Sequence, residues 1–303
     1  MSLTLYKYSV SLDLIFISII LRTIIPLTHN LFLGTFMIKL CYITGEMSDD
    51  FDKALELGAN AGIDTVQLRM GLFGKNIEQL NDDDIPRTKD TLAKHNMNIG
   101  MLLPPFAKCN IEDTEAIAEH HKTFIRTVEI AHALGTKLIR AFPFLSEKGT
   151  RWNPPPFDQY LDRIVENLMP SVKHAEAEGI TMCMEVNGGT IGVTERHTRQ
   201  VIDALDSKAV EAIWEIDSGW HFGEPPSQGY HHLKGLIQDV HVKINANGEL
   251  DPIWETNETH TDVVRQLLAD GYNGMMTIEH WPGEEGTLKG LHQLGEILKQ
   301  EQN

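Results

Sequence analysis

The amino-acid sequence predicts an α/β protein, a (β/α)₈ barrel of the TIM-barrel type that occupies residues 37–303. Two observations support this fold. Eight short β-rich runs alternate with helical segments, and strands that alternate with helices pair in parallel through right-handed crossovers. The length of this part is also close to the roughly 250 residues of a typical TIM barrel, so one domain is expected.

The eight expected strands are short runs rich in β-branched and other apolar residues. Eight such units close into a barrel more readily than they form an open sheet, which is the alternative. An open sheet usually carries a Gly-rich phosphate loop after its first strand, and Thr44-Gly45-Glu46-Met47 is not one. The strands are expected at residues 38–44, 65–70, 98–103, 137–142, 181–187, 212–217, 240–245 and 275–281.

The main helices are expected between these strands, and several carry residues that begin or end a helix. Ser48 can N-cap the first helix. Gly135, Gly179 and Gly271 stand where helices must end and turn into strands. These helices are expected at residues 48–60, 113–134, 157–178 and 261–270.

The first 36 residues differ in character from the rest of the chain. The apolar run Leu14–Leu21 is shorter than the roughly 20 residues that cross a bilayer. No cleavage site of the A-x-A kind follows it, since the first alanine is Ala54. We therefore expect Met37 to be the start of the folded protein and residues 1–36 to be a leader outside the fold. A membrane tether is the alternative.

Charge and cysteine content limit the classes of partner. The 43 acidic residues outnumber the 26 basic ones and give a formal charge of −17, which opposes binding to nucleic acid and to anionic membranes. Cys41, Cys109 and Cys183 are nowhere spaced as CxxC, which argues against a disulfide framework or a structural zinc site. We expect a cytoplasmic protein without stable membrane insertion, and a homo-oligomer is one option for its assembly.

Ionisable residues recur at the C-terminal ends of the fifth to eighth expected strands, where the chemistry of a TIM barrel gathers. Because alternate side chains of a strand point inward, Glu185 on the fifth strand and Glu215 and Asp217 on the sixth face the lumen. The same alternation directs His241 on the seventh strand and Glu279 on the eighth inward. Four consecutive strands thus aim an ionisable side chain at one axis.

Buried carboxylates repel one another unless they are paired or bind a metal. One divalent cation at this axis would remove the repulsion, and ion pairs with Lys243 or Arg140 are the alternative. Three carboxylates and one imidazole suit Mn²⁺, which we expect first, and also Mg²⁺, Co²⁺ or Zn²⁺. The expected ligands are Glu185, Asp217, His241 and Glu279.

The chain contains the runs MEVNGG, EIDSGWH, DVHVKIN, NGELDPIW and TIEHW in this order. They resemble the sugar isomerase and epimerase barrels of the xylose-isomerase-like superfamily, which includes tagatose epimerases, hydroxypyruvate isomerases and inosose dehydratases. The resemblance covers residues 37–300. It implies that one carboxylate or imidazole from each of the last four strands ligates a divalent metal, here Glu185, Asp217, His241 and Glu279.

Four residues are expected to bind substrate. Arg140 ends the fourth strand and could hold a hydroxyl, carboxylate or phosphate, with an ion pair to Glu215 as the alternative. Lys243 could stabilise an enolate oxygen, and a salt bridge to a ligand carboxylate is the alternative. The family often places a substrate-contacting histidine three residues after the aspartate. This chain has Trp220 there and His221 one residue later, with rim packing as the alternative for Trp220.

The leading expectation is a divalent-metal-dependent sugar isomerase or epimerase that works by proton transfer next to a metal-bound carbonyl. Glu185 and Glu279 would flank the reacting carbon as base and acid, and the partner would be a small-molecule sugar, polyol or keto acid. A dehydratase of the inosose or dehydroshikimate type is the nearest alternative, and a non-catalytic sugar-binding barrel is another. A trinuclear zinc endonuclease of this superfamily needs further histidines on the second and third strands, and residues 67–70 and 101–104 contain none.

Overall fold

Eight parallel strands, hydrogen-bonded in chain order from β1 to β8 and back to β1, form a closed barrel. The computed structural model describes residues 38–149, 153–253, 256–280 and 283–302, so the expected leader at residues 1–36 lies outside the described residues. The predicted (β/α)₈ TIM barrel is confirmed. The strands are β1 (Lys39–Ile43), β2 (Thr65–Leu68), β3 (Asn98–Leu102), β4 (Leu138–Ala141), β5 (Thr181–Glu185), β6 (Val210–Glu215), β7 (Ile237–Lys243) and β8 (Met275–Glu279).

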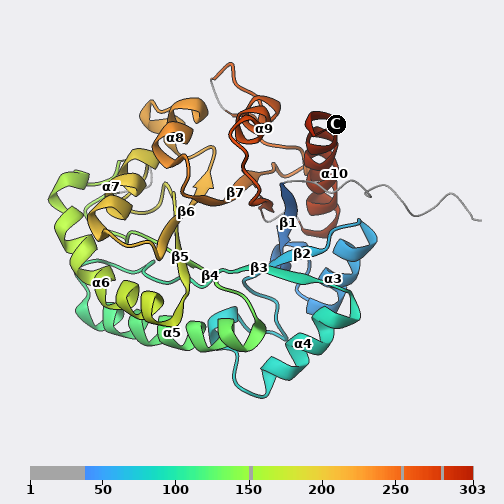
Figure 1. The fold of residues 1–303 in the computed structure, drawn as a ribbon, viewed down its shortest axis with the longest axis horizontal. Helices are drawn as coiled ribbons and strands as arrows, with labels where there is room; N and C mark the ends of the chain where they lie inside the picture. The colour runs from blue at the N-terminus through green and yellow to red at the C-terminus, as the bar shows by residue number, and fades with distance from the viewer. Residues whose placement is uncertain (1–37, 150–152, 254–255, 281–282, 303) are drawn as a thin grey trace, which may run out of the picture. The chain divides into compact units, whose positions relative to one another are not determined.

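Helices surround the ring of strands (Figure 1). Between consecutive strands the chain passes through at least one of them, as parallel pairing requires. The α-helices are α2 (Thr44–Met47), α3 (Phe51–Asn60), α4 (Asp84–Lys94), α5 (Thr114–Leu134), α6 (Leu161–Glu178), α7 (Glu195–Leu205), α8 (Pro226–Leu233), α9 (His260–Ala269) and α10 (Gly283–Glu301). Short 3₁₀ helices are η1 (Ile77–Gln79), η2 (Phe157–Gln159) and η3 (Gly219–Phe222).

The helix ends agree with the sequence in part. Gly135 and Gly179 end α5 and α6 in the left-handed conformation, with φ of 82° and 65°. The prediction for Ser48 was wrong, because α2 occupies the turn after β1 and α3 begins only after Asp50. The Asp50 side chain accepts a hydrogen bond from the Lys53 amide at 3.2 Å and caps α3 instead.

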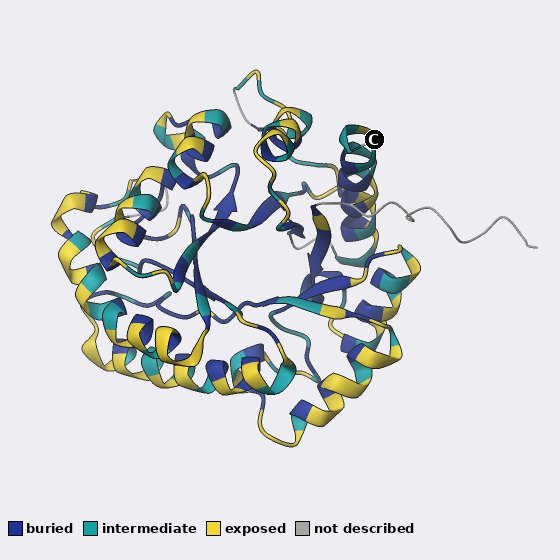
Figure 2. Ribbon diagram, viewed as in Figure 1, coloured by how far each residue is buried: buried dark blue, intermediate teal, exposed yellow. Residues whose placement is uncertain are grey.

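Two apolar cores hold the barrel together. The larger one lies between the strands and the helices, and Figure 2 shows helices buried on the side that faces the strands and exposed on the other. The smaller one lies inside the lumen, because alternate strand residues point to the axis. This inner core consists of Cys41, Ile43, Met101, Leu103, Cys183, Ile213 and Met275.

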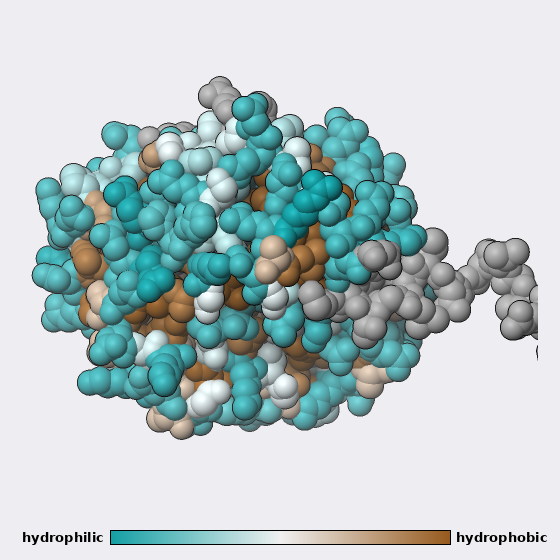
Figure 3. Space-filling model, turned by 45° about the horizontal axis from the view of Figure 1, so that its top comes forward, coloured by the Kyte–Doolittle hydropathy of each residue, from teal (hydrophilic) through white to brown (hydrophobic). Residues whose placement is uncertain are grey.

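The outer surface is mainly polar. On the face shown in Figure 3, hydrophilic side chains predominate and apolar ones lie recessed between them. Within the described ranges, Ile125 on α5 is the only exposed large hydrophobic residue. No helix in the described part of the chain is long and apolar enough to cross a membrane.

Candidate metal centre

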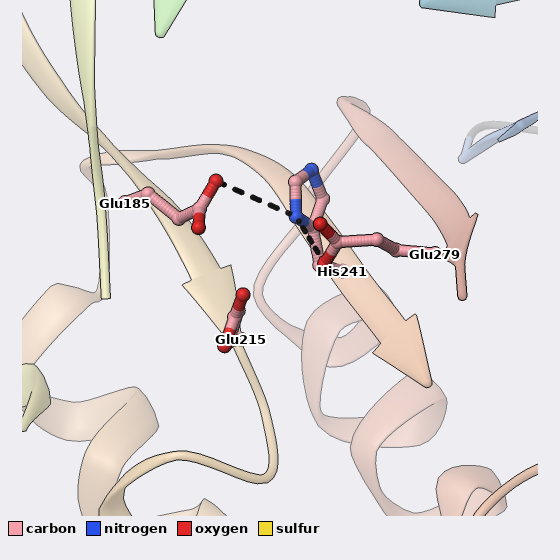
Figure 4. Close-up of side chains that lie close together, drawn as sticks. All are labelled: Glu185, Glu215, His241 and Glu279. Atoms are coloured by element: carbon pink, nitrogen blue, oxygen red, sulfur yellow. Dashed lines mark hydrogen bonds and ion pairs between the residues drawn. The ribbon is translucent and has the colours of Figure 1, made fainter. Parts of the chain in front are cut away.

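Four ionisable side chains meet at the C-terminal end of the lumen. They are Glu185, Glu215, His241 and Glu279, and one ligand atom from each lies within 4.8 Å of the others. Their exposed fractions are 1, 1, 0 and 7%. Figure 4 shows the four side chains pointing toward one another from β5, β6, β7 and β8. We call this set the acidic cluster.

Strand register brings the cluster together. Glu215 on β6 and His241 on β7 are direct neighbours across the sheet. Lys243 lies one inward position further along β7 and is the direct neighbour of Glu279 on β8. Glu185 and Glu279 are the last residues of their strands. The cluster therefore sits where the strands end and the rim loops begin, as expected for the site of a TIM barrel.

Asp217, the expected ligand from the sixth strand, is not in the acidic cluster, and Glu215 takes its place. β6 ends at Glu215 and the chain then turns, so the alternation of the strand does not continue to Asp217. Asp217 nevertheless borders the cluster, since its charge acts on Glu215 and Lys243. One of its carboxylate oxygens is buried without a hydrogen-bond partner in the described structure.

Two cations expected to bind substrate are paired with the cluster. Arg140 is buried and donates from Nη1 to Glu185 Oε2 at 2.9 Å and from Nη2 to the Leu103 carbonyl at 2.9 Å. Its partner is therefore Glu185 and not Glu215. Lys243 Nζ donates to Glu215 Oε1 at 3.1 Å and also to Glu279 Oε2. The carboxylates of the cluster therefore converge and are also paired with Arg140 and Lys243.

Trp220 and His221 lie on η3, in the segment that follows β6. Their ring centroids are 3.8 Å apart. Trp220 is half-buried and its indole Nε1 has no hydrogen-bond partner in the described part of the chain, while His221 is exposed. Neither belongs to the acidic cluster, and contact of either residue with a substrate stays a prediction.

Burial and ion pairing shift the pKa values of two of the carboxyl groups in different directions. Burial raises the pKa of Glu215 to about 8, although Lys243 opposes the shift. Burial would also raise the pKa of Glu185, but the Arg140 guanidinium outweighs it and leaves that pKa below its usual value. Burial and Arg140 thus shift the pKa values of Glu215 and Glu185 in opposite directions.

The other two members of the cluster form an ion pair. Burial disfavours the ionised Glu279, but Lys243 and His241 outweigh it and hold the Glu279 pKa well below its usual value. Burial likewise disfavours the charged imidazole, yet Glu279 and Asp239 raise the His241 pKa well above its usual value. His241 Nδ1 lies 3.1 Å from Glu279 Oε2, in agreement with this pairing.

Several residues around the cluster were not singled out from the sequence. Asn187 Nδ2 donates to Glu185 Oε1 at 2.7 Å. Glu46, in the turn after β1, accepts from Arg69 Nη1 at 2.8 Å and from the His280 amide at 2.7 Å. Asp239 lies on β7 two residues before His241 and shares its inward direction. The alternation that identified His241 could have identified Asp239 as well.

The donors of the cluster suit a divalent ion. Three carboxylates and one imidazole are ligands for hard or borderline ions such as Mn²⁺, Mg²⁺ or Zn²⁺. Their atoms already converge, and the buried oxygen of Asp217 without a partner adds a further unsatisfied negative group next to them. No cysteine belongs to the cluster. The residues present therefore fit a divalent metal.

Fold and site together define the class of protein: a (β/α)₈ barrel with a buried glutamate and histidine cluster suited to a divalent metal. The match to a family model extends over residues 55–297. The chain belongs to the family of xylose isomerase-like TIM barrels. No curated protein sequence matches the chain.

Solved structures of this class share the fold at low sequence identity. A xylose isomerase-like TIM barrel protein from Mycobacterium smegmatis, in complex with magnesium, has a TM-score of 0.65 and 15% identity over 89% of this chain and 98% of its own. D-psicose 3-epimerase from Clostridium cellulolyticum H10, with D-tagatose, gives 0.67 and 13% over 88% and 98%. The probable 3-DHS dehydratase AsbF from Bacillus anthracis gives 0.66 and 12% over 85% and 99%.

Proposed function

We propose that this protein is a divalent-metal-dependent sugar isomerase or epimerase that moves a proton at the carbon next to a carbonyl group. The observation that carries the proposal is the convergence of Glu185, Glu215, His241 and Glu279 at the C-terminal end of a xylose isomerase-like barrel. Epimerases with this fold are among the similar structures, which supports the reaction class. The substrate class is a small sugar, polyol or keto acid.

Three ligands of the ion are proposed to be Glu185, His241 and Glu279. A bound divalent ion, Mn²⁺ first and Mg²⁺, Co²⁺ or Zn²⁺ as alternatives, would polarise the substrate carbonyl and acidify the neighbouring C–H bond. Two carboxylates compete for the fourth position. Glu215 lies in the cluster but has to release a proton, since its pKa is about 8. Asp217 lies beside the cluster and has a buried oxygen without a described partner.

Glu185 and Glu279 are proposed to transfer the proton. They approach the cluster from β5 and β8, on different sides of the lumen (Figure 4). Arg140 holds the carboxylate of Glu185 and Lys243 holds that of Glu279, so both are oriented and kept ionised. With one carboxylate on each face of a substrate carbon, one would remove the proton, and the other, after it takes up a proton from solvent, would donate that proton to the opposite face.

Arg140, Lys243, Trp220 and His221 keep their proposed role in substrate binding. The Nη1 and Nη2 atoms of Arg140 already contact Glu185 and the Leu103 carbonyl, which fixes the position of the guanidinium group. Arg140 would therefore bind a substrate from this fixed position. Lys243 can place its ammonium group near a developing enolate oxygen, since it lies between Glu215 and Glu279.

Turnover in deuterated water tests the proposal. A screen of ketoses and aldoses with the Mn²⁺-loaded protein should yield an epimer or isomer that carries deuterium at the reacting carbon. The label follows from proton transfer through a carboxylate that exchanges with solvent. A fully active enzyme with an unlabelled product would reject the two-glutamate scheme, because a direct hydride shift leaves no solvent label. No conversion of any sugar, with tight binding of one, would instead favour a sugar-binding barrel.

A dehydratase is the second candidate, because the probable 3-DHS dehydratase from Bacillus anthracis shares the fold. Removal of the same proton followed by loss of a β-hydroxyl group gives a dehydrated product with the same carboxylates. Mass spectrometry of the products separates the two reactions, since isomers keep the substrate mass and dehydration lowers it by one water.

A further inference from the structure

A second layer of polar side chains lies directly beneath the acidic cluster, inside the lumen. Gln67 on β2, Asp239 on β7 and Thr277 on β8 are completely buried. Thr277 Oγ1 donates to Asp239 Oδ1 at 2.9 Å, and Gln67 Nε2 donates to Asp239 Oδ2. Gln67 Nε2 also donates to Thr277 Oγ1 at 2.8 Å. Three strands thus hold the Asp239 carboxylate in one orientation.

His241 connects this layer to the cluster above it. Its Nδ1 lies 3.1 Å from Glu279 Oε2 and 4.0 Å from Glu185 Oε2, so this edge of the ring faces the cluster. Its Nε2 lies 3.0 Å from Asp239 Oδ2. This distance is that of an ion pair, and Nε2 has no hydrogen-bond partner in the described structure. The two ring nitrogens therefore face two different acidic groups.

We infer that Asp239 is a positioning residue that selects the tautomer of His241 for metal binding. A histidine that ligates a metal through one nitrogen usually donates the N–H of the other to a carboxylate or carbonyl. Asp239 favours a proton on Nε2 through this ion pair, so the proton that a bound ion would displace is the one on Nδ1, which faces Glu185 and Glu279. Gln67 and Thr277 act on Asp239 and keep its oxygens from turning away. This inference rests on the metal site in the proposed function.

The chemistry of Asp239 supports this role over simple packing. A carboxylate without exposure to water is costly unless charged or hydrogen-bonding partners surround it. Gln67 and Thr277 are neutral donors, and His241 is the partner that can carry a positive charge. An apolar residue or an amide would fill the same space at lower cost. Among the described partners of Asp239, only His241 can offset the cost of a buried negative charge at this position.

Asp239→Asn is the decisive variant, because the amide keeps the size but removes the negative charge that faces Nε2. Without that charge, Nε2 loses its preference for the proton, and Nδ1 is less often the nitrogen that is free for the metal. Titration calorimetry of the metal-stripped protein with Mn²⁺ should show a loss of about 10- to 100-fold in affinity. Thr277→Val, which deletes one donor to Asp239, should cause a smaller loss. Asp90→Asn on the exposed surface is the matched control and should bind as the wild type does.

A spectroscopic readout separates positioning from a purely structural role. Nitrogen-15 NMR of the Zn²⁺-loaded protein, labelled at histidine, should show a protonated Nε2 on His241 in the wild type, and part of the His241 population should lack that signal in Asp239→Asn. Equal Mn²⁺ affinity of the variant, together with a retained Nε2–H signal, overturns the inference while the metal site stands. A wild type that binds no divalent ion overturns the proposed function instead. Circular dichroism and melting of the metal-free proteins show whether Asp239→Asn folds, and Thr277→Val carries the test if it does not.

Discussion

The ends of β1 and β3 and the ends of β5 to β8 line the same lumen with opposite chemistry. β1 and β3 direct Cys41 and Met101 inward, and the chain ends of these strands add Ile43 and Leu103, all of them at most 1% exposed. β5 to β8 direct the acidic cluster inward, and its members are also buried. Both groups of strand ends follow one alternation rule and one closed sheet. The difference lies only in which residues occupy the inward positions.

Burial has opposite energetic signs for these two kinds of side chain. Apolar side chains in the lumen gain roughly 25 cal/mol for each Å² removed from water. Carboxylates at the same depth lose hydration and repel one another. Arg140 and Lys243 offset part of that cost through their ion pairs. The inner apolar core, to which β5, β6 and β8 also contribute, therefore stabilises the fold, and the acidic cluster maintains a site that a divalent cation would complete.

The largest expected effect is on turnover, from a single change in the acidic cluster. Glu279→Gln should lower kcat by about 10²- to 10⁴-fold, because it removes one of the two proton-transferring groups. The fold should persist, since β8 and its backbone hydrogen bonds do not depend on this charge. Steady-state kinetics with the best sugar from the screen measures the loss. Glu56→Gln on the exposed face of α3 is the control, and comparable loss there would contradict the assignment.

Metal binding should raise the free energy of unfolding of the protein, because the ion would bind only the folded acidic cluster. At a free Mn²⁺ concentration 1,000 times Kd, the free energy of unfolding should rise by about 4 kcal/mol over the chelated protein. Urea denaturation with and without a chelator measures this difference. Identical curves, together with no metal in elemental analysis of the purified protein, would rule out the proposed metal site.

The fourth ligand can be found by comparing two variants. If Glu215 ligates, Glu215→Gln should weaken Mn²⁺ binding and Asp217→Asn should leave it nearly unchanged. The opposite result would assign the position to Asp217, whose buried oxygen has no described partner. Because the Glu215 pKa is about 8, ligation by Glu215 also releases a proton, and the increase of Mn²⁺ affinity from pH 6 to 8 should then be smaller in Glu215→Gln than in the wild type.

A substitution in the inner core should affect stability and leave metal binding unchanged. Met101 is fully buried in the inner core, and Met101→Ala should lower the free energy of unfolding by about 2–5 kcal/mol. Mn²⁺ affinity of the folded variant should match the wild type in calorimetry. A large loss of affinity would show that packing of the inner core and metal binding are coupled.

The cost of burying a carboxyl group can also be tested outside the lumen, at Glu195 on α7. Burial raises the pKa of Glu195 to about 8, helped by Glu224 and Asp217, and its described contacts include the Trp214 indole N–H at 2.9 Å but no ion pair. The folded state keeps a proton that the unfolded state releases, so this contribution to stability is full below pH 4.5 and is lost as the pH rises to about 8. Glu195→Gln should remove this dependence and stabilise the protein at pH 8.5 by up to about 4 kcal/mol. Urea denaturation across pH 5 to 8.5 tests it, and parallel profiles would contradict it.

The smallest expected effect comes from removing residues 1–36, which we predict to lie outside the fold. A protein of residues 37–303 should express in soluble form and melt at the same temperature as the full chain. Failure of the shorter protein to fold, or a lower melting temperature, would show that the first segment contributes to the barrel.

The sequence predicted the fold well because its signals are local and repeated. Alternating runs and the glycines at 135 and 179 placed the strands and helix ends within a few residues. The inward direction of Glu185, His241 and Glu279 followed from strand alternation and is confirmed. Asp217 differs because alternation holds only inside a strand, and β6 ends two residues earlier at Glu215.

The pairing of charges could not be predicted in the same way. The partner of Arg140 depends on which rotamers fit the closed lumen, and the structure selects Glu185 over Glu215. The contact of Glu46 with Arg69 joins a turn and a strand end that no periodicity relates. Such pairs follow from barrel closure, which brings residues far apart in the chain to one axis.

The inner core beneath the acidic cluster also limits how a small molecule can enter and leave the site. Cys183, Ile213 and Met275 precede Glu185, Glu215 and Glu279 on their own strands, and none is more than 6% exposed. The lumen is therefore blocked below the cluster, and a small molecule that reaches it has to depart along the path of its arrival. One molecule therefore has to leave the site before another can enter it. In the proposed enzyme, substrate and product would therefore compete for the same opening.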